Sequence, residues 1–323
     1  MEAQGWESAL VVSEDPGHLV MTALCDSNCC VDLGRLTVVS LPVAGGSVGV
    51  RNASRRTPSS ISRSPDTGEL YHRGLYSDDM RWRPRLLPAE PPELLVYDDP
   101  TPCPYLEGRQ ARMPLRVPTR MLTHAEFAAR LRTGDRRQGV LLYRTACPSC
   151  RACEPIRIDT EAFAPNKTQR RIYRRGLERL DIEIGPPELT SEKVALYNLH
   201  KTGRDLSPDG QDIDEQGYRA FLVDSCCDSF EIRYRHDGKL VGVAIVDRAE
   251  DALSAVYFYF DPTFEPLSPG VFSILKQLEL CRTWGLRYLY LGLYIAECPS
   301  MAYKATYLPH ERLLGGCWQR VEV

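Results

Sequence analysis

The last third of the chain carries an ordered series of patterns that few folds can accommodate. Three segments alternate or run apolar, at residues 229–234, 239–247 and 253–260, and turn dipeptides at Asp237-Gly238 and Glu250-Asp251 separate them. This spacing predicts an antiparallel meander. The amphipathic segment 270–284, with Gly285 as the C′ residue, predicts a helix, and the apolar run 286–295 predicts a buried strand. Together they indicate an α+β fold.

Meander, helix and strand in this order favour an N-acetyltransferase-like (GNAT-type) sheet, with a substrate cleft where neighbouring strands splay apart. Upstream, apolar residues at helical spacing predict helices at 123–133, 167–180, 192–201 and 215–224. Short strands are expected at 139–144 and 155–159.

The first 92 residues show no coherent core pattern. Residues 47–65 are rich in Ser, Arg, Gly and Pro, and four prolines lie between residues 81 and 92. The run at 36–50 could form a strand or two. We therefore expect residues 1–92 to be a poorly ordered extension, residues 93–180 a cysteine-rich basic N-terminal module and residues 181–323 an acetyltransferase-like domain. Met80 is a more natural beginning than Met1.

No apolar run approaches the ~20 residues that span a bilayer, and no basic segment followed by an apolar one marks a secretory signal. We expect a cytoplasmic protein. In a reducing compartment, the 12 cysteines are more readily metal ligands, reactive thiols or small core residues than disulfides.

Three cysteines lie in two overlapping C-x-x-C units, Cys147, Cys150 and Cys153. This spacing lets thiolates converge on one cation, and Cys103 is the obvious fourth ligand. The set could hold structural zinc or an iron–sulfur cluster, and the alternative is thiols without metal. Four protein thiolates leave no open position for a reacting water, so a metal held there need not be catalytic. We expect no cofactor to be required for the chemistry.

Positive charge is concentrated between Arg109 and Arg179, where 17 Lys and Arg stand against 6 Asp and Glu, although the whole chain has a net charge of −3. Such a stretch is typical of a polyanion partner. In the segment 167–180, Arg170 and Arg171 each precede another arginine by four residues. Like charges at that spacing repel, and an anionic ligand would offset the repulsion. A solvated basic surface is the alternative.

Seven segments, in order, resemble the arginyl-tRNA–protein transferase family, and more closely its bacterial branch, the aspartate/glutamate leucyltransferases. They are PCPYLEGRQAR (102–112), CPSCRACEPIRI (147–158), PNKTQRR (165–171), LSAVYFYFDP (253–262), SILKQLELC (273–281), YLYLGLYI (288–295) and CPSMAYKATYLPHE (298–311). The resemblance implies transfer of an amino acid from charged tRNA to proteins with N-terminal Asp or Glu, in the N-degron pathway. It also implies a metal or cluster site in the cysteine module and an acetyltransferase-like C-terminal part.

Three segments depart from the family pattern. Residues 268–272 read SPGVF where S-L-G-T-[YF] is usual, residues 291–294 read LGLY for LGYW, and Arg204-Asp205 stands where bacterial members usually have Arg-His. These changes leave the transferred residue open. Leucine is favoured because the resemblance is closer to the bacterial branch. A leucine pocket needs only apolar walls, whereas an arginine pocket needs a buried carboxylate, which Asp205 could supply.

Aminoacyl transfer needs a neutral amine, donors for the tetrahedral oxyanion and a cation for the acceptor's carboxylate. Tyr257, Tyr294 and Asp261 are the candidate catalytic residues, Asp261 because it could hold or deprotonate the ammonium. Arg112, Lys304 and the Arg170–Arg171 pair are the candidate cations. Asp261 before Pro262 is also a common strand terminator, and Lys304 could be a solvated loop lysine.

Two other functions fit part of the sequence. An acyl-CoA-dependent acetyltransferase usually carries a glycine-rich pyrophosphate loop before the long helix, but this chain reads FEPLSPGVF there. A Cys₄ nucleic-acid-binding module would not require so large an aromatic C-terminal half.

Overall fold

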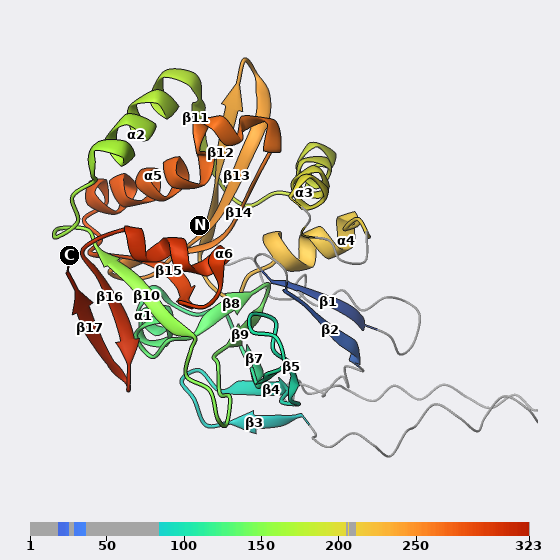
Figure 1. Cartoon of the computed structure of the whole chain (residues 1–323). Helices are drawn as coiled ribbons and strands as arrows, with labels where there is room; N and C mark the ends of the chain where they lie inside the picture. Colours follow the sequence, from blue (N-terminus) through green and yellow to red (C-terminus); the bar gives the residue numbers. More distant parts are fainter. Residues whose placement is uncertain (1–18, 26–28, 37–83, 205, 207–210, 323) are drawn as a thin grey trace, which may run out of the picture.

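The computed structural model describes residues 19–25, 29–36, 84–204, 206 and 211–322. An eight-stranded sheet forms its centre, in the order β11-β12-β13-β14-β15-β10-β16-β17 (Figure 1). All neighbours in it pair antiparallel except β14 and β15, which are parallel. The strands are β10 (Glu154–Asp159), β11 (Asp181–Gly185), β12 (Ser229–His236), β13 (Lys239–Arg248), β14 (Ala252–Phe260), β15 (Tyr288–Tyr294), β16 (His310–Leu314) and β17 (Cys317–Val321).

The predicted meander, helix and strand are confirmed as β12, β13, β14, α5 (Pro269–Thr283) and β15. The turn after β12 contains Asp237 and Gly238, both with positive φ, as the turn dipeptide requires. Gly285, at φ +68°, follows the helix as expected of a C′ residue. The mixed α and β content is therefore as the sequence predicts.

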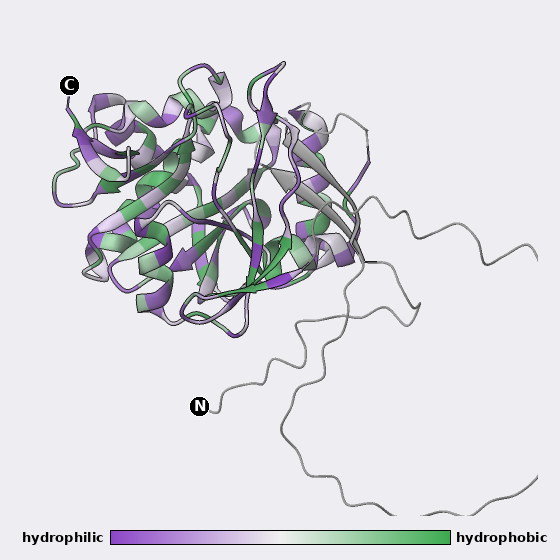
Figure 2. Cartoon of the chain, turned by 90° about the horizontal axis from the view of Figure 1, so that it is seen from below, coloured by the Kyte–Doolittle hydropathy of each residue, from purple (hydrophilic) through white to green (hydrophobic). Residues whose placement is uncertain are grey.

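Helices cover both faces of the large sheet. α2 (Lys167–Arg179) and α5 pack on one face, around Phe272, Leu278 and Ile232. α3 (Ser191–Gly203), α4 (Glu215–Tyr218) and the π-helical turn η2 (Arg219–Val223) cover the other, around Tyr197, Tyr218 and Tyr259. Figure 2 shows hydrophobic residues concentrated along the interior strands. The core therefore has three layers, helix, sheet and helix.

A second sheet of five short strands, in the order β3-β4-β7-β9-β8, lies beside the first. Its strands are β3 (Arg85–Leu87), β4 (Glu93–Tyr97), β7 (Leu115–Pro118), β8 (Arg136–Gln138) and β9 (Leu141–Tyr143). Helix α1 (His124–Arg132) joins the two sheets, because Phe127 and Leu131 pack with Leu142 of the small sheet and Tyr290 of the large one.

Helix α1 begins at a capping box of Thr123 and Glu126, and α2 begins at one of Asn166 and Gln169. These two helices were predicted within one residue of their observed ends. Three small elements complete the described structure: the hairpin of β1 (Leu19–Cys25) and β2 (Cys29–Leu36), the pair β5 (Thr101–Pro102) and β6 (Gln110–Ala111), and the turns α6 (Pro299–Ala302), η3 (Pro262–Leu267) and η4 (Tyr303–Thr306).

The predicted boundary at residue 180 does not separate the two sheets. β10 pairs with β15 and β16, and α2 packs on α5, so both belong with the strands that follow residue 180. The physical reason is that sequence spacing reveals local patterns but not long-range strand pairing. Most of the predicted strand segment at 36–50 lies outside the described residues. In the part of the chain described, no helix is both long and apolar enough to cross a membrane.

Candidate functional site at the divergence of two parallel strands

The parallel strands β14 and β15 pair over only three residues and then separate. Ala252, Leu253 and Ser254 pair with Tyr288, Leu289 and Tyr290, and the described strands are unpaired with each other beyond that point. The register of each strand with its outer neighbour shifts at the same level, leaving Val256 and Leu291 as extra residues. β-Bulges end pairing and redirect side chains, so they account for the gap between the two strands. The cleft predicted where neighbouring strands splay apart is therefore present.

A small cavity lies at this divergence. Its walls come from β8, β9, η2, β14, β15 and the α6–η4 turn, and the residues that line it are Tyr105, Arg136, Arg137, Gln138, Tyr143, Phe221, Val256, Tyr257, Leu293, Met301 and Lys304. Three of these are cations, several are apolar or aromatic, and no Asp or Glu occurs among these described residues. A concave site with apolar walls and a few polar groups is the usual form of a ligand site.

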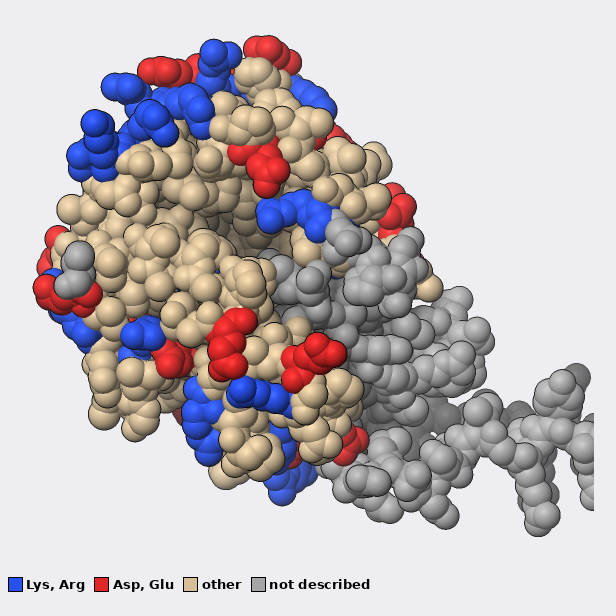
Figure 3. Space-filling model, in the orientation of Figure 1, with Lys and Arg blue, Asp and Glu red and all other residues tan. Residues whose placement is uncertain are grey.

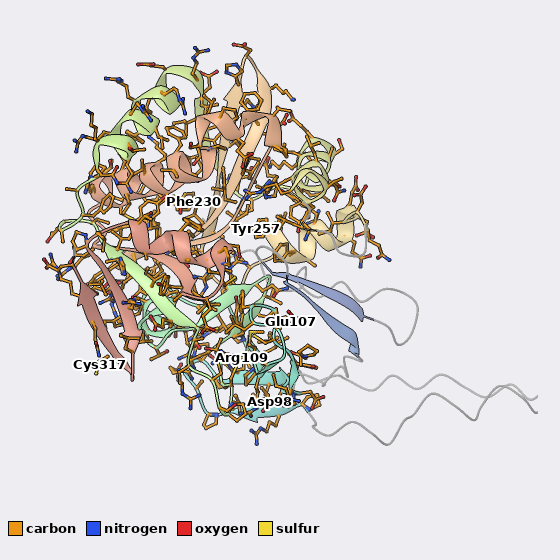
Figure 4. The ribbon with its side chains drawn as sticks, in the orientation of Figure 1. Asp98, Glu107, Arg109, Phe230, Tyr257 and Cys317 are labelled. Carbon is orange, nitrogen blue, oxygen red and sulfur yellow. The ribbon has the colours of Figure 1, made fainter. Side chains whose placement is uncertain are left out.

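Lys304, predicted from the MAYKATY segment, is in this cavity and is buried. Its Nζ donates a hydrogen bond to the Leu293 carbonyl oxygen at 2.8 Å and contacts the Met301 sulfur at 3.1 Å. Lys304 is thus tied to the diverging strand β15, and the solvated-loop interpretation is wrong. Tyr257 of β14 lines the same cavity, near the middle of the molecule in Figure 4.

The other catalytic candidates lie elsewhere. Tyr294 packs against the core on the α5 face, and the Arg312 guanidinium lies 5.0 Å from its ring centroid. Asp261 caps η3: it accepts hydrogen bonds from Thr263 and, at 2.7 Å, from Lys239 Nζ. Burial alone would raise the pKa of Asp261, but these hydrogen bonds hold it below its usual value. The structure favours the strand-terminating interpretation of this aspartate.

The remaining cations predicted for substrate also lie outside the cavity. Arg112 pairs with Asp98 at 2.7 Å, beside the small sheet. Arg170 and Arg171 are exposed on α2 with Lys167, Arg174 and Arg179, and Figure 3 shows Lys and Arg gathered over this helix. Asp205 lies outside the described residues.

Two buried histidines are held by backbone. Burial lowers the pKa of His200 to about 4, although a hydrogen bond with the Phe260 backbone opposes the shift. Burial also lowers the pKa of His310, whose Nδ1 contacts the Tyr307 carbonyl oxygen at 3.2 Å. Both environments indicate structural roles.

The two segments that carry the predicted metal-ligand cysteines lie close together in the structure. Cys103 and Cys153 pack against one apolar cluster, which also includes Cys298 and Met301. The Arg109 guanidinium donates to Cys150 Sγ at 3.5 Å, and the Arg112 backbone N–H donates to Cys147 Sγ at 3.5 Å. A backbone hydrogen bond at Ala152, followed by the one from Arg109, lowers the pKa of Cys150. The apolar cluster joins the cysteines to the turn that carries Lys304.

The donor chemistry of these cysteines suits a thiophilic metal. In the arrangement described, however, no group of three or more His, Cys, Asp or Glu side chains among the described residues is placed to hold a metal ion. The geometry therefore does not fit a Cys₄ site as it stands, and metal binding by Cys103, Cys147, Cys150 and Cys153 stays a prediction.

Sequence reasoning missed Arg136, which is the first residue of β8 and lines the cavity between β14 and β15. Its Nη2 donates to the Ala255 carbonyl oxygen at 3.3 Å. In the sequence it is one arginine in the run Arg136-Arg137, and no local signal separates the two. The neighbouring Arg137 is buried and forms a two-pronged ion pair with Asp247, with both N–O distances at 2.7 Å.

Comparison with known proteins places this site in a family. The model of the arginine-tRNA-protein transferase N terminus matches residues 101–171, and that of the C terminus matches residues 192–314. An aspartate/glutamate leucyltransferase of Chromobacterium violaceum is 41% identical over 220 residues, which cover 68% of this chain and 90% of the relative. One of Thiobacillus denitrificans is 40% identical over 245 residues, which cover 73% and 99%.

The chain belongs to the arginine-tRNA-protein transferase family. Within that family it falls in the bacterial branch of aspartate/glutamate leucyltransferases, and it is an aminoacyltransferase. The two matched ranges include the cysteine segments and every residue that lines the cavity. They include only the first five residues of α2, because residues 172–191 fall between them.

Proposed function

We propose that this transferase moves leucine from leucyl-tRNA to the N-terminal amine of proteins that begin with Asp or Glu, and that transfer takes place in the cavity between β14 and β15. The observation that carries the proposal is the lining of this cavity, which combines cations with apolar side chains and, among the described residues, has no carboxylate. A guanidinium donor would enter it without a partner, and a desolvated unpaired cation is costly. A leucyl group needs only apolar contacts, for which Leu293, Phe221 and Met301 are suited.

The reaction makes limited demands on the protein. The acceptor amine must lose a proton and attack the ester carbonyl carbon, forming the amide bond, while the bond from that carbon to the ribose oxygen breaks and the oxygen takes up a proton. An aminoacyl ester is already activated, so positioning and hydrogen-bond donors can supply most of the catalysis. We assign Tyr257 as a donor to the oxyanion or to the leaving oxygen, since its side chain lines the cavity.

The fold supports the same proposal. Two parallel strands that diverge after a bulge, followed by a helix that packs on one face, are what we expect of the acetyltransferase-like architecture. We also propose that tRNA lies along α2, because five exposed Lys and Arg side chains share this helix: Lys167, Arg170, Arg171, Arg174 and Arg179. Removal of the protein marked in this way would be the N-degron role implied by the family.

One assay tests the central proposal. Purified protein is incubated with labelled leucyl-tRNA or arginyl-tRNA and with peptides that differ only in a first residue of Asp, Glu, Ala or Lys. We expect leucine on the Asp and Glu peptides, and a fixed cation should reject Lys. Faster transfer of arginine than of leucine would overturn the donor assignment, and equal transfer to the Ala peptide would overturn the acceptor assignment.

A further inference from the structure

Arg136 differs from neighbouring arginines because its charge has no counterion among the residues that the structure describes. None of the ion pairs between described residues includes it, whereas Arg137 pairs with Asp247 and Arg116 pairs with Glu93 and Asp135. Its Nη1 is buried and makes no hydrogen bond with the part of the chain that the structure describes. Leaving a buried donor of a charged group unsatisfied costs free energy, so a ligand that satisfies it would bind favourably.

The guanidinium is held in place by both diverging strands. On β14 it donates to Ala255, and on β15 it lies against Gly292, where a Cβ atom would stand 2.5 Å from Nη1. Gly292 has φ +87°, a conformation that favours glycine. Lys304 binds the next carbonyl of the same strand, that of Leu293. The two cations therefore flank one short stretch of β15.

The unsatisfied Nη1 of Arg136, beside an Nη2 that uses one of its two hydrogens on Ala255, leaves N–H donors for a ligand. A carboxylate is the group that accepts the N–H donors of a guanidinium best. The cavity is small and has largely apolar walls, which suits an amino-acid side chain better than a hydrated phosphate. In the proposed reaction, the group of that size and charge is the side chain of the acceptor's first residue.

We propose that Arg136 is the specificity-determining residue of the acceptor site, binding the side-chain carboxylate of an N-terminal Asp or Glu. Lys304 adds positive charge beside it. This assignment rests on the proposed function, and it explains how a neutral or basic first residue is rejected: the first leaves Arg136 unpaired, and the second repels it.

The test compares peptides that begin with Glu and with Gln, which differ in charge but hardly in shape. Binding is measured by calorimetry, with and without uncharged tRNA, and transfer is measured with leucyl-tRNA. In Arg136→Gln, we expect binding and kcat/KM for the Glu peptide to fall by about 30-fold or more, mainly through KM, because one partner of a desolvated charge pair is removed. Values for the Gln peptide should change by less than about 2-fold, so that the preference for Glu disappears.

Arg136→Lys keeps the positive charge but loses the paired N–H donors of the guanidinium. We expect this variant to retain part of the preference for the Glu peptide over the Gln peptide. It also serves if Arg136→Gln folds poorly, which the melting temperature of each variant will show. Arg144→Gln is the matched control: it removes an arginine from the same basic stretch, one whose side chain is 51% exposed. It should leave the Glu-to-Gln ratio unchanged.

Three outcomes overturn the assignment. The first is an unchanged preference for Glu in both Arg136 variants. The second is an equal loss of activity with Glu and Gln peptides through kcat, which would indicate a role at the oxyanion. The third is wild-type protein that binds both peptides equally. Failure of the proposed function is distinguishable, because it would abolish transfer from leucyl-tRNA while Arg136-dependent binding of the Glu peptide persisted.

Discussion

The arginines of the cavity and those of helix α2 come from one basic stretch of sequence, and the fold gives them opposite surroundings. On α2 most of the basic side chains are exposed, although Arg175 is partly buried, and the one ion pair between described residues of the helix, Arg174 with Glu178, spans 3.9 Å at the surface. At the cavity, Arg137 is buried against Asp247, and Arg136 is partly buried and forms no ion pair with any described residue. An exposed positive face suits a long polyanion that is bound through many weak contacts, whereas an enclosed, oriented guanidinium suits one carboxylate.

This difference teaches that a local excess of positive charge has more than one physical meaning. Some arginines of the stretch hold the two sheets together, such as Arg137, and others pair with Glu311 or Asp98, such as Arg157 and Arg112. Only those left without partners by the fold can offer their charge to a ligand. The predictions below separate the groups by what each substitution changes.

The largest expected effect is on stability, at Arg137. Replacing it with Met leaves Asp247 buried without its partner, and we expect the free energy of unfolding to fall by about 3–5 kcal/mol. Urea denaturation monitored by circular dichroism measures this. Arg174→Met, on the exposed face of α2, is the control and should change stability by less than about 0.5 kcal/mol. The double variant Arg137→Met with Asp247→Leu should recover much of the lost free energy of unfolding. A loss below about 1 kcal/mol for Arg137→Met alone would show that the ion pair does not hold the sheets together.

The sequence predicts the elements with strong local signals. The capping boxes at Thr123 and Asn166 mark the starts of α1 and α2, and the alternation and turns of residues 229–260 give the meander. The small sheet was largely missed, because its strands are short and stabilised by pairing across long sequence separations. β10 was recognised as a strand but assigned to a different module, since only its pairing with β15 reveals its place.

The same limit applies to the site. Lys304 and Tyr257, which line the cavity, were predicted as site residues because they lie in segments that resemble the family. Arg136 was not found, because its role depends on a gap between β14 and β15 that no local pattern encodes. The tertiary structure alone decides that Arg137 pairs with Asp247 whereas the adjacent Arg136 lines the cavity without an ion pair to any described residue.

A smaller effect on stability is expected from substitutions of the cysteines. They test whether the thiols that contact Arg109 and Arg112 form a metal site. If the four thiols close around a metal, protein purified anaerobically will contain about one equivalent of zinc, or the iron of one cluster. Cys150→Ser and Cys153→Ser should each abolish the bound metal and lower the free energy of unfolding, because metal binding and folding are coupled. Without a bound metal, the loss should be smaller than at Arg137, since both cysteines are only partly buried and lie outside the main core.

Metal analysis by plasma mass spectrometry is the measurement. Cys317→Ser is the control, because that thiol is exposed on β17 and should not affect the metal content. Wild-type protein without zinc or iron would show that these thiols serve only in packing, in keeping with the arrangement described.

The smallest effect is expected on α2, where no single side chain should matter much. Arg170→Ala combined with Arg171→Ala should weaken binding of every tRNA alike, charged or uncharged, and should leave stability nearly unchanged because both side chains are exposed. The slope of log Kd against log salt concentration should decrease by between about 1 and 2, because up to two phosphate contacts and their released counterions are lost. The preference for Glu over Gln peptides should stay intact, in contrast to Arg136→Gln.

Filter binding over a series of salt concentrations measures the slope. The control for net charge is Arg235→Ala combined with Arg320→Ala, on β12 and β17. A slope that falls equally in both double variants would mean that α2 contributes charge without contacting tRNA, and the contrast between an extended face and a single oriented guanidinium would then fail on the α2 side.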